Sequence, residues 1–212
     1  MKKFELTSEF VTFLGKKLFR IKALVSFGDV KEGELGGLVE KEENLDQSGN
    51  AWVSGNAWVS GDARVYGDDW VSGDARVSGY ARVYGDARVY GNAWVSGDAR
   101  VYGDAWVSGD ARVSGDARVS GDARVYGNAW VSGDARVQNC RDYSATSCFG
   151  SENRTTTFFR TKDGGISVRC GCFYGTLAEF REKVKERHGG RRLAKEYLML
   201  ADLMEFRLSK DE

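Results

Sequence analysis

Between residues 49 and 138 the chain repeats one pattern of small, polar and apolar positions every six residues. Each unit reads Gly, Asn or Asp, Ala, Trp or Arg, Val, and Ser or Tyr, and its glycine recurs fifteen times from Gly49 to Gly133. Ala and Val stand two positions apart, so in an extended strand they share one face and the larger residues share the other. The Gly-Asn/Asp pair interrupts the strand, because these residues tolerate positive φ angles. The pattern therefore predicts a short strand and a tight turn in every unit.

Three such units close a triangular coil, so we predict a mainly β fold, a single-stranded parallel β-helix with an interior of stacked Ala and Val. The 90 residues of the array correspond to about five coils, and a spacing of about 4.8 Å gives a prism about 24 Å long. A long α-helix is excluded, since each regularly spaced glycine would cost about 1 kcal/mol.

The recurring Val-x-Gly-Asp-Ala-x units resemble those of the hexapeptide-repeat proteins. This resemblance implies a left-handed β-helix, although the general rule for crossovers between parallel strands favours the right-handed sense. We follow the resemblance, because a six-residue unit is too short for an ordinary crossover.

Because three units make one coil, every third unit lies on the same face, and this assigns the outward positions to three faces. The third face is a candidate binding surface, because like charges in one column repel unless an anion or an acidic partner meets them. Its alternative role is purely structural, with Asp62, Asp98, Asp116 and Asp134 neutralising the column from the adjacent corner. The candidate binding residues are Arg64, Arg82, Arg100, Arg118, Tyr66, Tyr84 and Tyr102, and Arg136, Ser120 and Gln138 complete the two columns.

The other two faces mix tryptophan and arginine. On the second face a corner Asn precedes each Trp and a corner Asp precedes each Arg, so we predict that arginines stack between tryptophans and that the Asp offsets their charge. Such ladders stabilise a sheet without any ligand. The second face reads Trp58, Arg76, Trp94, Arg112 and Trp130, and the first face reads Trp52, Trp70, Arg88, Trp106 and Arg124.

The two ends of the array need caps, because a solenoid exposes its core and strand edges there. Residues 1–48 are predicted to form an N-terminal β cap, with a hairpin over 1–24 that turns at Gly15-Lys16 and an irregular first coil over 25–48.

Residues 139–212 are predicted to form a small C-terminal ββαα domain. Its hairpin joins 155–161 to 166–173, and Thr176-Leu-Ala-Glu179 is a capping box that starts the first helix. A second helix is expected over 191–206, and some of the apolar surface of this domain is expected to cover the last coil or another subunit.

These terminal segments carry a second resemblance, which covers nearly the whole chain. Leu18-Phe-Arg-Ile-Lys-Ala23, Leu35-Gly-Gly37 and Glu42-Glu-Asn-Leu45 at the start, and Thr155-Thr-Thr-Phe-Phe-Arg160 and Gly175-Thr-Leu-Ala-Glu-Phe180 at the end, are similar to a largely uncharacterised group of phage and bacterial repeat proteins. The resemblance implies a fold and a mobile-element context, and it supplies no activity.

Catalytic chemistry is not indicated. Residues 49–138 contain no His, Cys, Lys or Glu, so the serines have no base and no triad can be drawn. The single histidine, His188, stands beside Gly-Gly after a helix, where a cationic side chain is favourable. The four cysteines could form a zinc site, but their spacing is not the usual Cys-x₂-Cys. Buried thiols are therefore the preferred interpretation of Cys140, Cys148, Cys170 and Cys172. We expect Cys170 and Cys172 to point the same way on one strand. Asp69 falls at an inward Ala position, where we expect a local bulge or a turn hydrogen bond.

Charge and composition narrow the function further. The 31 basic and 31 acidic residues balance, which argues against broad capture of nucleic acid or of anionic membranes. No secretion signal or membrane span is recognisable, so we expect reduced cysteines and a cytoplasmic location.

We therefore predict a non-enzymatic binding protein, without metal or cofactor, whose C-terminal helices mediate self-association or partner docking. A homo-oligomer is the expected assembly. In a phage context it would have an anti-defence role, sequestering or blocking a host protein or an anionic small molecule such as a nucleotide signal. The alternative is a structural spacer or assembly module with no ligand.

Overall fold

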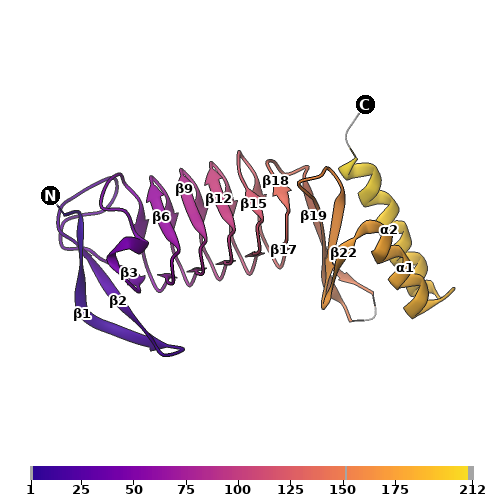
Figure 1. The fold of residues 1–212 in the computed structure, drawn as a ribbon, viewed down its shortest axis with the longest axis horizontal. Coiled ribbons are helices and arrows are strands. Elements are labelled where there is room, and N and C mark those ends of the chain that lie inside the picture. Colours follow the sequence, from indigo (N-terminus) through magenta and orange to yellow (C-terminus); the bar gives the residue numbers. More distant parts are fainter. Residues whose placement is uncertain (1, 151, 210–212) are drawn as a thin grey trace.

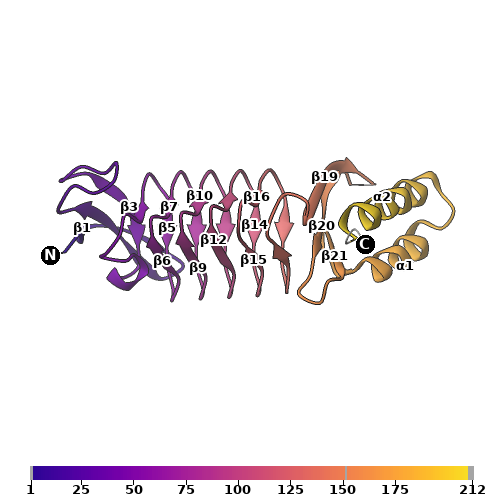
Figure 2. The same cartoon turned by 90° about the horizontal axis from the view of Figure 1, so that it is seen from above.

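The computed structural model describes residues 2–150 and 152–209 and shows a β-solenoid with a cap at each end. Figure 1 shows the coils stacked along one axis, with a β-hairpin at the N-terminal end and two helices at the C-terminal end. Figure 2 shows the same order from above, with the C-terminal sheet lying between the last coil and the helices. The predicted solenoid is confirmed.

The repeat strands lie in three parallel sheets, and each strand pairs with the third strand after it along the chain. This pairing confirms the assignment of outward positions to three faces. The first face contains β4 (Trp52–Val53), β7 (Trp70–Val71), β10 (Arg88–Val89), β13 (Trp106–Val107) and β16 (Arg124–Val125). The second contains β5 (Trp58–Val59), β8 (Arg76–Val77), β11 (Trp94–Val95), β14 (Arg112–Val113) and β17 (Trp130–Val131). The third contains β6 (Arg64–Gly67), β9 (Arg82–Gly85), β12 (Arg100–Gly103), β15 (Arg118–Val119) and β18 (Arg136–Val137).

The core is narrow because only small side chains point inward. The repeat Ala and Val residues are almost fully buried and form one continuous cluster along the axis. At the corners, glycine lies against glycine of the next coil: a Cβ added at Gly85 or at Gly115 would stand 2.9 Å from the next corner nitrogen. Both glycines also have positive φ angles, of 100° and 67°. The corner therefore excludes any other residue on grounds of both space and backbone conformation.

The N-terminal cap consists of an antiparallel hairpin and one irregular coil, as predicted. The hairpin pairs β1 (Phe4–Phe13) with β2 (Lys16–Ala23). On its other edge β2 pairs in antiparallel register with β3 (Leu35–Val39), which pairs in parallel with β5. Leu45 then lies opposite Val65, whereas Val65 lies opposite Val83. The first coil is thus slightly longer than a repeat coil, and it begins the solenoid ahead of the array.

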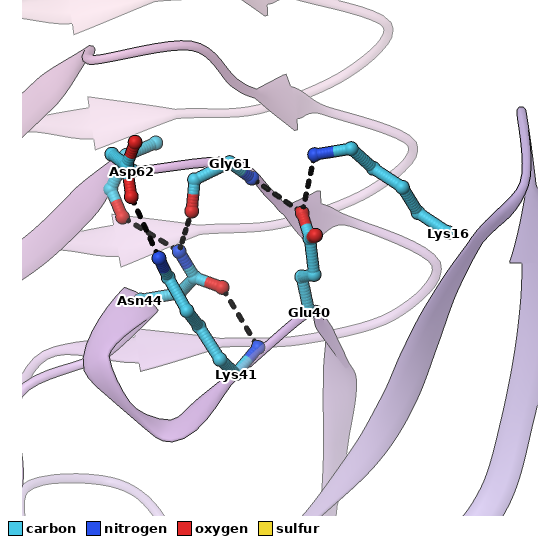
Figure 3. Close-up of polar contacts among 7 residues, drawn as sticks. Lys16, Glu40, Lys41, Asn44, Gly61 and Asp62 are labelled. Atoms are coloured by element: carbon cyan, nitrogen blue, oxygen red, sulfur yellow. Dashed lines mark hydrogen bonds and ion pairs between the residues drawn. The ribbon is translucent and has the colours of Figure 1, made fainter.

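Side chains take over hydrogen bonds that a preceding coil would make. In the short 3-10 helix η1 (Glu42–Asn44), the buried Asn44 amide donates to the carbonyls of Gly61, at 3.0 Å, and Ala63, at 2.9 Å. Glu40 accepts from the Gly61 N–H at 2.6 Å, and Lys41 pairs with Asp62 at 2.7 Å (Figure 3). Lys3 similarly donates its ammonium group to carbonyls of residues 48, 49 and 51, where burial lowers the pKa of Lys3 to about 8.

The C-terminal domain differs from the predicted ββαα unit. Its described residues form a four-stranded antiparallel sheet: β19 (Tyr143–Phe149), β20 (Arg154–Arg160), β21 (Ile166–Cys170) and β22 (Phe173–Thr176). β19 was not predicted because its side chains are mostly small and polar, and the predicted 166–173 strand is divided by a turn at Gly171, whose φ is 58°. The prediction that Cys170 and Cys172 share one strand is therefore wrong.

The helices follow the sequence signals closely. The capping box is present, with Thr176 accepting from the Glu179 N–H and Glu179 accepting from the Thr176 N–H, and it begins α1 (Leu177–His188). The second helix, α2 (Arg192–Leu208), packs beside α1.

Two adjacent phenylalanines of β20 join the domain to the solenoid. Phe159 is fully buried in the solenoid core, and Phe158 is fully buried in a second core with the helices. Thr157 also accepts from the Trp130 N–H at 3.0 Å. The sheet therefore closes the last coil with one face and holds the helices with the other, which confirms that this domain covers the end of the solenoid.

Asp69 is fully buried in the Ala column. One carboxyl oxygen accepts from the Ala87 N–H of the next coil at 2.8 Å, and the other has no partner among the described residues. The expected local bulge or turn bond is thus replaced by a bond between coils. Burial, which outweighs this hydrogen bond, raises the pKa of Asp69 from 3.8 to about 8.

We predict that Asp69 makes the fold less stable as the pH rises. A carboxyl group with a higher pKa in the folded state stabilises the fold fully below its unfolded pKa near 3.8, and this contribution is lost as the pH rises to about 8. The slope is at most about 1.4 kcal/mol per pH unit. Urea unfolding across this range should show the decline, and Asp69→Asn, which keeps the acceptor oxygen but does not titrate, should remove it. An unchanged slope in the variant would contradict this assignment.

We also predict that Asn44→Ala lowers the free energy of unfolding by about 2 kcal/mol, because the buried Ala63 carbonyl and the half-buried Gly61 carbonyl lose their donor. Hydrogen exchange at residues 61–66 should accelerate together with the loss of stability in urea. Glu43→Ala, at an exposed neighbour in the same short helix, is the control and should change stability little. Equal effects of the two substitutions would mean that the amide does not cap the coil.

Candidate binding face

The third face brings together all seven residues that the sequence singled out. Arg64 lies opposite Arg82, Arg82 opposite Arg100, and Arg100 opposite Arg118 in the parallel register. Their side chains are exposed or half-buried. Neighbouring coils are about 4.8 Å apart, so the face presents a continuous column of positive charge.

No carboxylate within the described residues lies within 4.0 Å of a charged nitrogen of this column. Asp62, which the sequence offered as a neutralising group, pairs with Lys41 of the cap. Arg136 at the end of the column donates to the carbonyls of Asp116, Asp134 and Ala135 instead of to their side chains. The direct pairing of the column by corner aspartates is therefore not observed.

The tyrosines of the same face form a stacked ladder. The Tyr66 and Tyr84 ring centroids are 5.2 Å apart with planes 5° from parallel, and those of Tyr84 and Tyr102 are 4.9 Å apart at 2°. Burial, reinforced by the two neighbouring phenols, raises the pKa of Tyr84. The ladder therefore offers phenol groups in fixed positions beside the guanidinium column.

Two grooves flank the N-terminal end of the column. One, of about 610 Å³, runs along Arg64, Tyr66 and Arg82 and is bounded by Glu42 and Asp46 of the cap. The other, of about 550 Å³, shares Arg64 and Arg82 and is bounded by Lys41, Asp62 and Tyr80. Carboxylates line both grooves, so the positive charge of the column is partly offset at this end of the face.

The second face confirms the predicted stacking of an arginine between two tryptophans at Arg112, whereas Arg76 contacts Trp58 and Phe13 of the cap. The Arg112 guanidinium lies 5.8 Å from the Trp94 ring and 5.4 Å from the Trp130 ring, and Arg76 lies 5.5 Å from Trp58. Trp130 also receives Arg169 of the C-terminal sheet at 3.7 Å. Each of these arginines thus has an aromatic partner within the chain.

The alternating Asn and Asp of this face form hydrogen bonds that the repeat pattern did not predict. The Asn92 amide donates to the Asp110 carboxylate of the next coil at 3.0 Å, and Asn56 donates to Asp74 at 3.3 Å. The alternation therefore provides hydrogen bonds between corners, in addition to any offset of the arginine charge.

The first face is partly covered. Trp52 is fully buried beneath Phe4 and Phe27 of the cap, so it is not available to a ligand. Beyond it a groove of about 570 Å³ lies between the cap loop and Trp70, Arg88 and Trp106. This groove was missed from the sequence because the loop at Gly28-Asp29 forms one of its walls.

The four cysteines do not come together. In the described part of the chain no group of three or more His, Cys, Asp or Glu side chains could hold a metal ion, and Cys140, Cys148 and Cys172 are exposed. The preference for buried thiols is therefore wrong for these three, because they lie in turns and at the outer end of β19. His188 is the last residue of α1 and stacks on Tyr197 at 5.7 Å.

Comparison with known proteins supports the solenoid. A family model described as the YdcK beta solenoid repeat matches residues 71–85, 81–97, 93–109, 105–121, 111–127 and 117–133. These matches cover the middle of the array, so the chain is similar to this family there. A search of curated proteins finds no match. No helix within the described residues is long and apolar enough to cross a membrane.

We predict that two substitutions, each removing one arginine charge, affect the free energy of unfolding differently. Arg112→Gln should lower the free energy of unfolding by about 0.5–1 kcal/mol, because its two cation–π contacts are lost. Arg100→Gln, in the middle of the unpaired column, should leave stability unchanged or raise it, because repulsion decreases. Urea unfolding at low and high salt measures both, and a loss of stability in Arg100→Gln equal to that in Arg112→Gln would show that the column also stabilises the fold.

Proposed function

We propose that this chain is a non-enzymatic binding protein whose Arg/Tyr face, formed by Arg64, Arg82, Arg100, Arg118, Tyr66, Tyr84 and Tyr102, meets an anionic partner. The observation that carries the proposal is the column of arginines in register with no carboxylate at ion-pair distance among the described residues. The partner is the acidic surface of a host protein or an anionic small molecule such as a nucleotide.

The energetics favour a ligand over a stabilising role for this column. Like charges directly opposite each other in a sheet are destabilising, and the other two faces of the same solenoid show arginines stacked on tryptophan. An anion would convert the repulsion into charge-assisted hydrogen bonds, which are about twice as strong as neutral ones. Because the backbone of the face is a rigid sheet, little backbone conformational entropy is lost on binding.

The proposal includes several finer statements, of which only the handedness and the phage or bacterial context rest on sequence resemblances. They are a left-handed coil, a phage or bacterial context with an anti-defence role, and assembly into a homo-oligomer through the C-terminal helices. The exposed side chains of Met199, Leu203 and Phe206 on α2 are compatible with such assembly.

A structural spacer is the second candidate, and the closed ends of the solenoid favour it. Asn44 and Lys3 cap one end, and Phe159 fills the core at the other end. On the second face, arginine and tryptophan side chains already contact one another without a ligand. A module of this kind would keep its assembly and partners when the Arg/Tyr face is neutralised.

The triple variant Arg64→Gln/Arg82→Gln/Arg100→Gln separates the two candidates. We expect it to lose any non-covalent mass that native mass spectrometry finds on the wild-type protein. Titration with ATP, ADP and inorganic pyrophosphate should show affinity at least about tenfold weaker than wild type, the factor that 1.4 kcal/mol represents. The wild-type affinity should also fall more steeply with salt than that of the variant.

The matched control is Arg88→Gln/Arg112→Gln/Arg124→Gln, which removes the same charge from the other two faces. It should retain binding, although its stability should fall through the lost contacts with Trp94, Trp106 and Trp130. Equal binding by all three proteins, or retention of a protein partner by the first variant in a pull-down, would favour the spacer.

A further inference from the structure

A further cavity lies in the C-terminal domain, far along the chain from the Arg/Tyr face. It has a volume of about 320 Å³ and lies between α1, α2 and the turn that joins β21 to β22. Figure 2 shows the two helices side by side beyond the sheet. The sequence did not indicate it, because its walls come from segments that are distant in the chain.

The floor of the cavity is apolar and aromatic. Phe180, Val184 and Tyr197 are at most 7% exposed and belong to the second core. The rings are held in fixed orientations: Phe180 lies 5.8 Å from Tyr197 at 86°, and Phe173 lies 5.5 Å from Phe180. His188 stacks on Tyr197 at 5.7 Å and 27°. These contacts leave a rigid aromatic surface that suits a flat ring.

The rim carries more positive than negative charge. Arg154, Lys183 and Arg187 lie around the opening together with Glu152. Arg154 has a long ion pair with Glu152 at 3.6 Å, and Lys183 pairs with Glu186 at 2.8 Å. Arg187 makes no ion pair within the described residues, so a guanidinium stands free beside the aromatic floor. The Arg154–Glu152 and Lys183–Glu186 pairs are exposed to water, where an ion pair contributes little to stability. Arg154 and Lys183 therefore remain able to bind an anion.

The polar atoms inside the cavity are few. The Cys170 thiol accepts from the Thr156 hydroxyl at 3.2 Å. Burial, together with the neighbouring Cys170, raises the pKa of Tyr197, so this phenol stays neutral near pH 7. A concave apolar surface with a small number of polar and charged groups at its edge is the usual form of a small-molecule site.

We propose that this cavity binds a small organic anion with a flat aromatic body, an aryl carboxylate or aryl sulfonate. The ring lies on Phe173, Phe180 and Tyr197, and the anionic group faces Arg154 and Arg187. This inference is independent of the Arg/Tyr face, because the two sites share no residue.

Two fluorescent probes of similar shape test the proposal. 1-Anilinonaphthalene-8-sulfonate carries the anionic group, and N-phenyl-1-naphthylamine lacks it. We expect the sulfonate to bind with a saturable signal and at least tenfold more tightly than the neutral probe. Arg154→Gln/Arg187→Gln should weaken the sulfonate about tenfold and leave the neutral probe unchanged, and raised salt should act in the same direction.

The control Arg192→Gln/Lys195→Gln removes the same charge from α2 outside the cavity and should leave both affinities unchanged. A second control, Met199→Ser/Leu203→Ser/Phe206→Ser, removes the exposed apolar side chains of α2, which also attract such probes. Circular dichroism verifies that each variant is folded. Equal affinity for the two probes, equal effects of the two charge variants, or loss of the signal in the second control would overturn the proposal.

Discussion

The structure depends on the contact between corner glycines of successive coils. Each corner backbone lies so close to the next that a Cβ at Gly85 or Gly115 would meet backbone nitrogen at 2.9 Å. The same glycines have positive φ angles, which allow the chain to turn after only a few residues. Because every corner meets the equivalent corner of the next coil, the coils cannot slip relative to one another. The inward Ala and Val columns and the outward ladders both follow from this register.

The register makes each outward position part of a column, so a side chain always meets the same position of its neighbours. On the second face, residue types alternate along each column, so like charges do not lie opposite one another. Arginine stacks on tryptophan there, and Asn92 donates to Asp110. On the third face the arginines are repeated without alternation, and the acidic Asp62 is engaged by the cap. Two solutions on one scaffold, exposed to the same solvent, imply different roles. The alternating ladder stabilises the solenoid, and the unpaired column is the surface that we propose for a partner.

The ends show how a periodic fold is closed by residues that do not repeat. At the start, the Asn44 amide and the Lys3 ammonium group supply donors to carbonyls that lack a preceding coil. At the other end, Phe159 fills the open core, while its neighbour Phe158 belongs to the helical core. The alternation of a single strand thus separates two cores, and it places the cavity between α1 and α2 apart from the solenoid. Asp69 is the exception inside the array, a buried carboxyl group retained at the cost of an unpaired oxygen.

The sequence alone determined the solenoid, the three faces and the boundaries of the helices, because these features depend on contacts with a fixed short period or within one helical turn. The columns of Arg64 and Tyr66 followed directly from counting the repeat units by threes. Tertiary structure alone decided which acids stay near the arginines, because Lys41 reaches Asp62 only once the irregular coil has folded. It also decided the fourth strand of the C-terminal sheet, the separation of Cys170 from Cys172 and the cavity lined by Arg154, Phe180 and Tyr197. These features join residues that are far apart in the chain and carry no repeat, so no pattern in the sequence records their contacts.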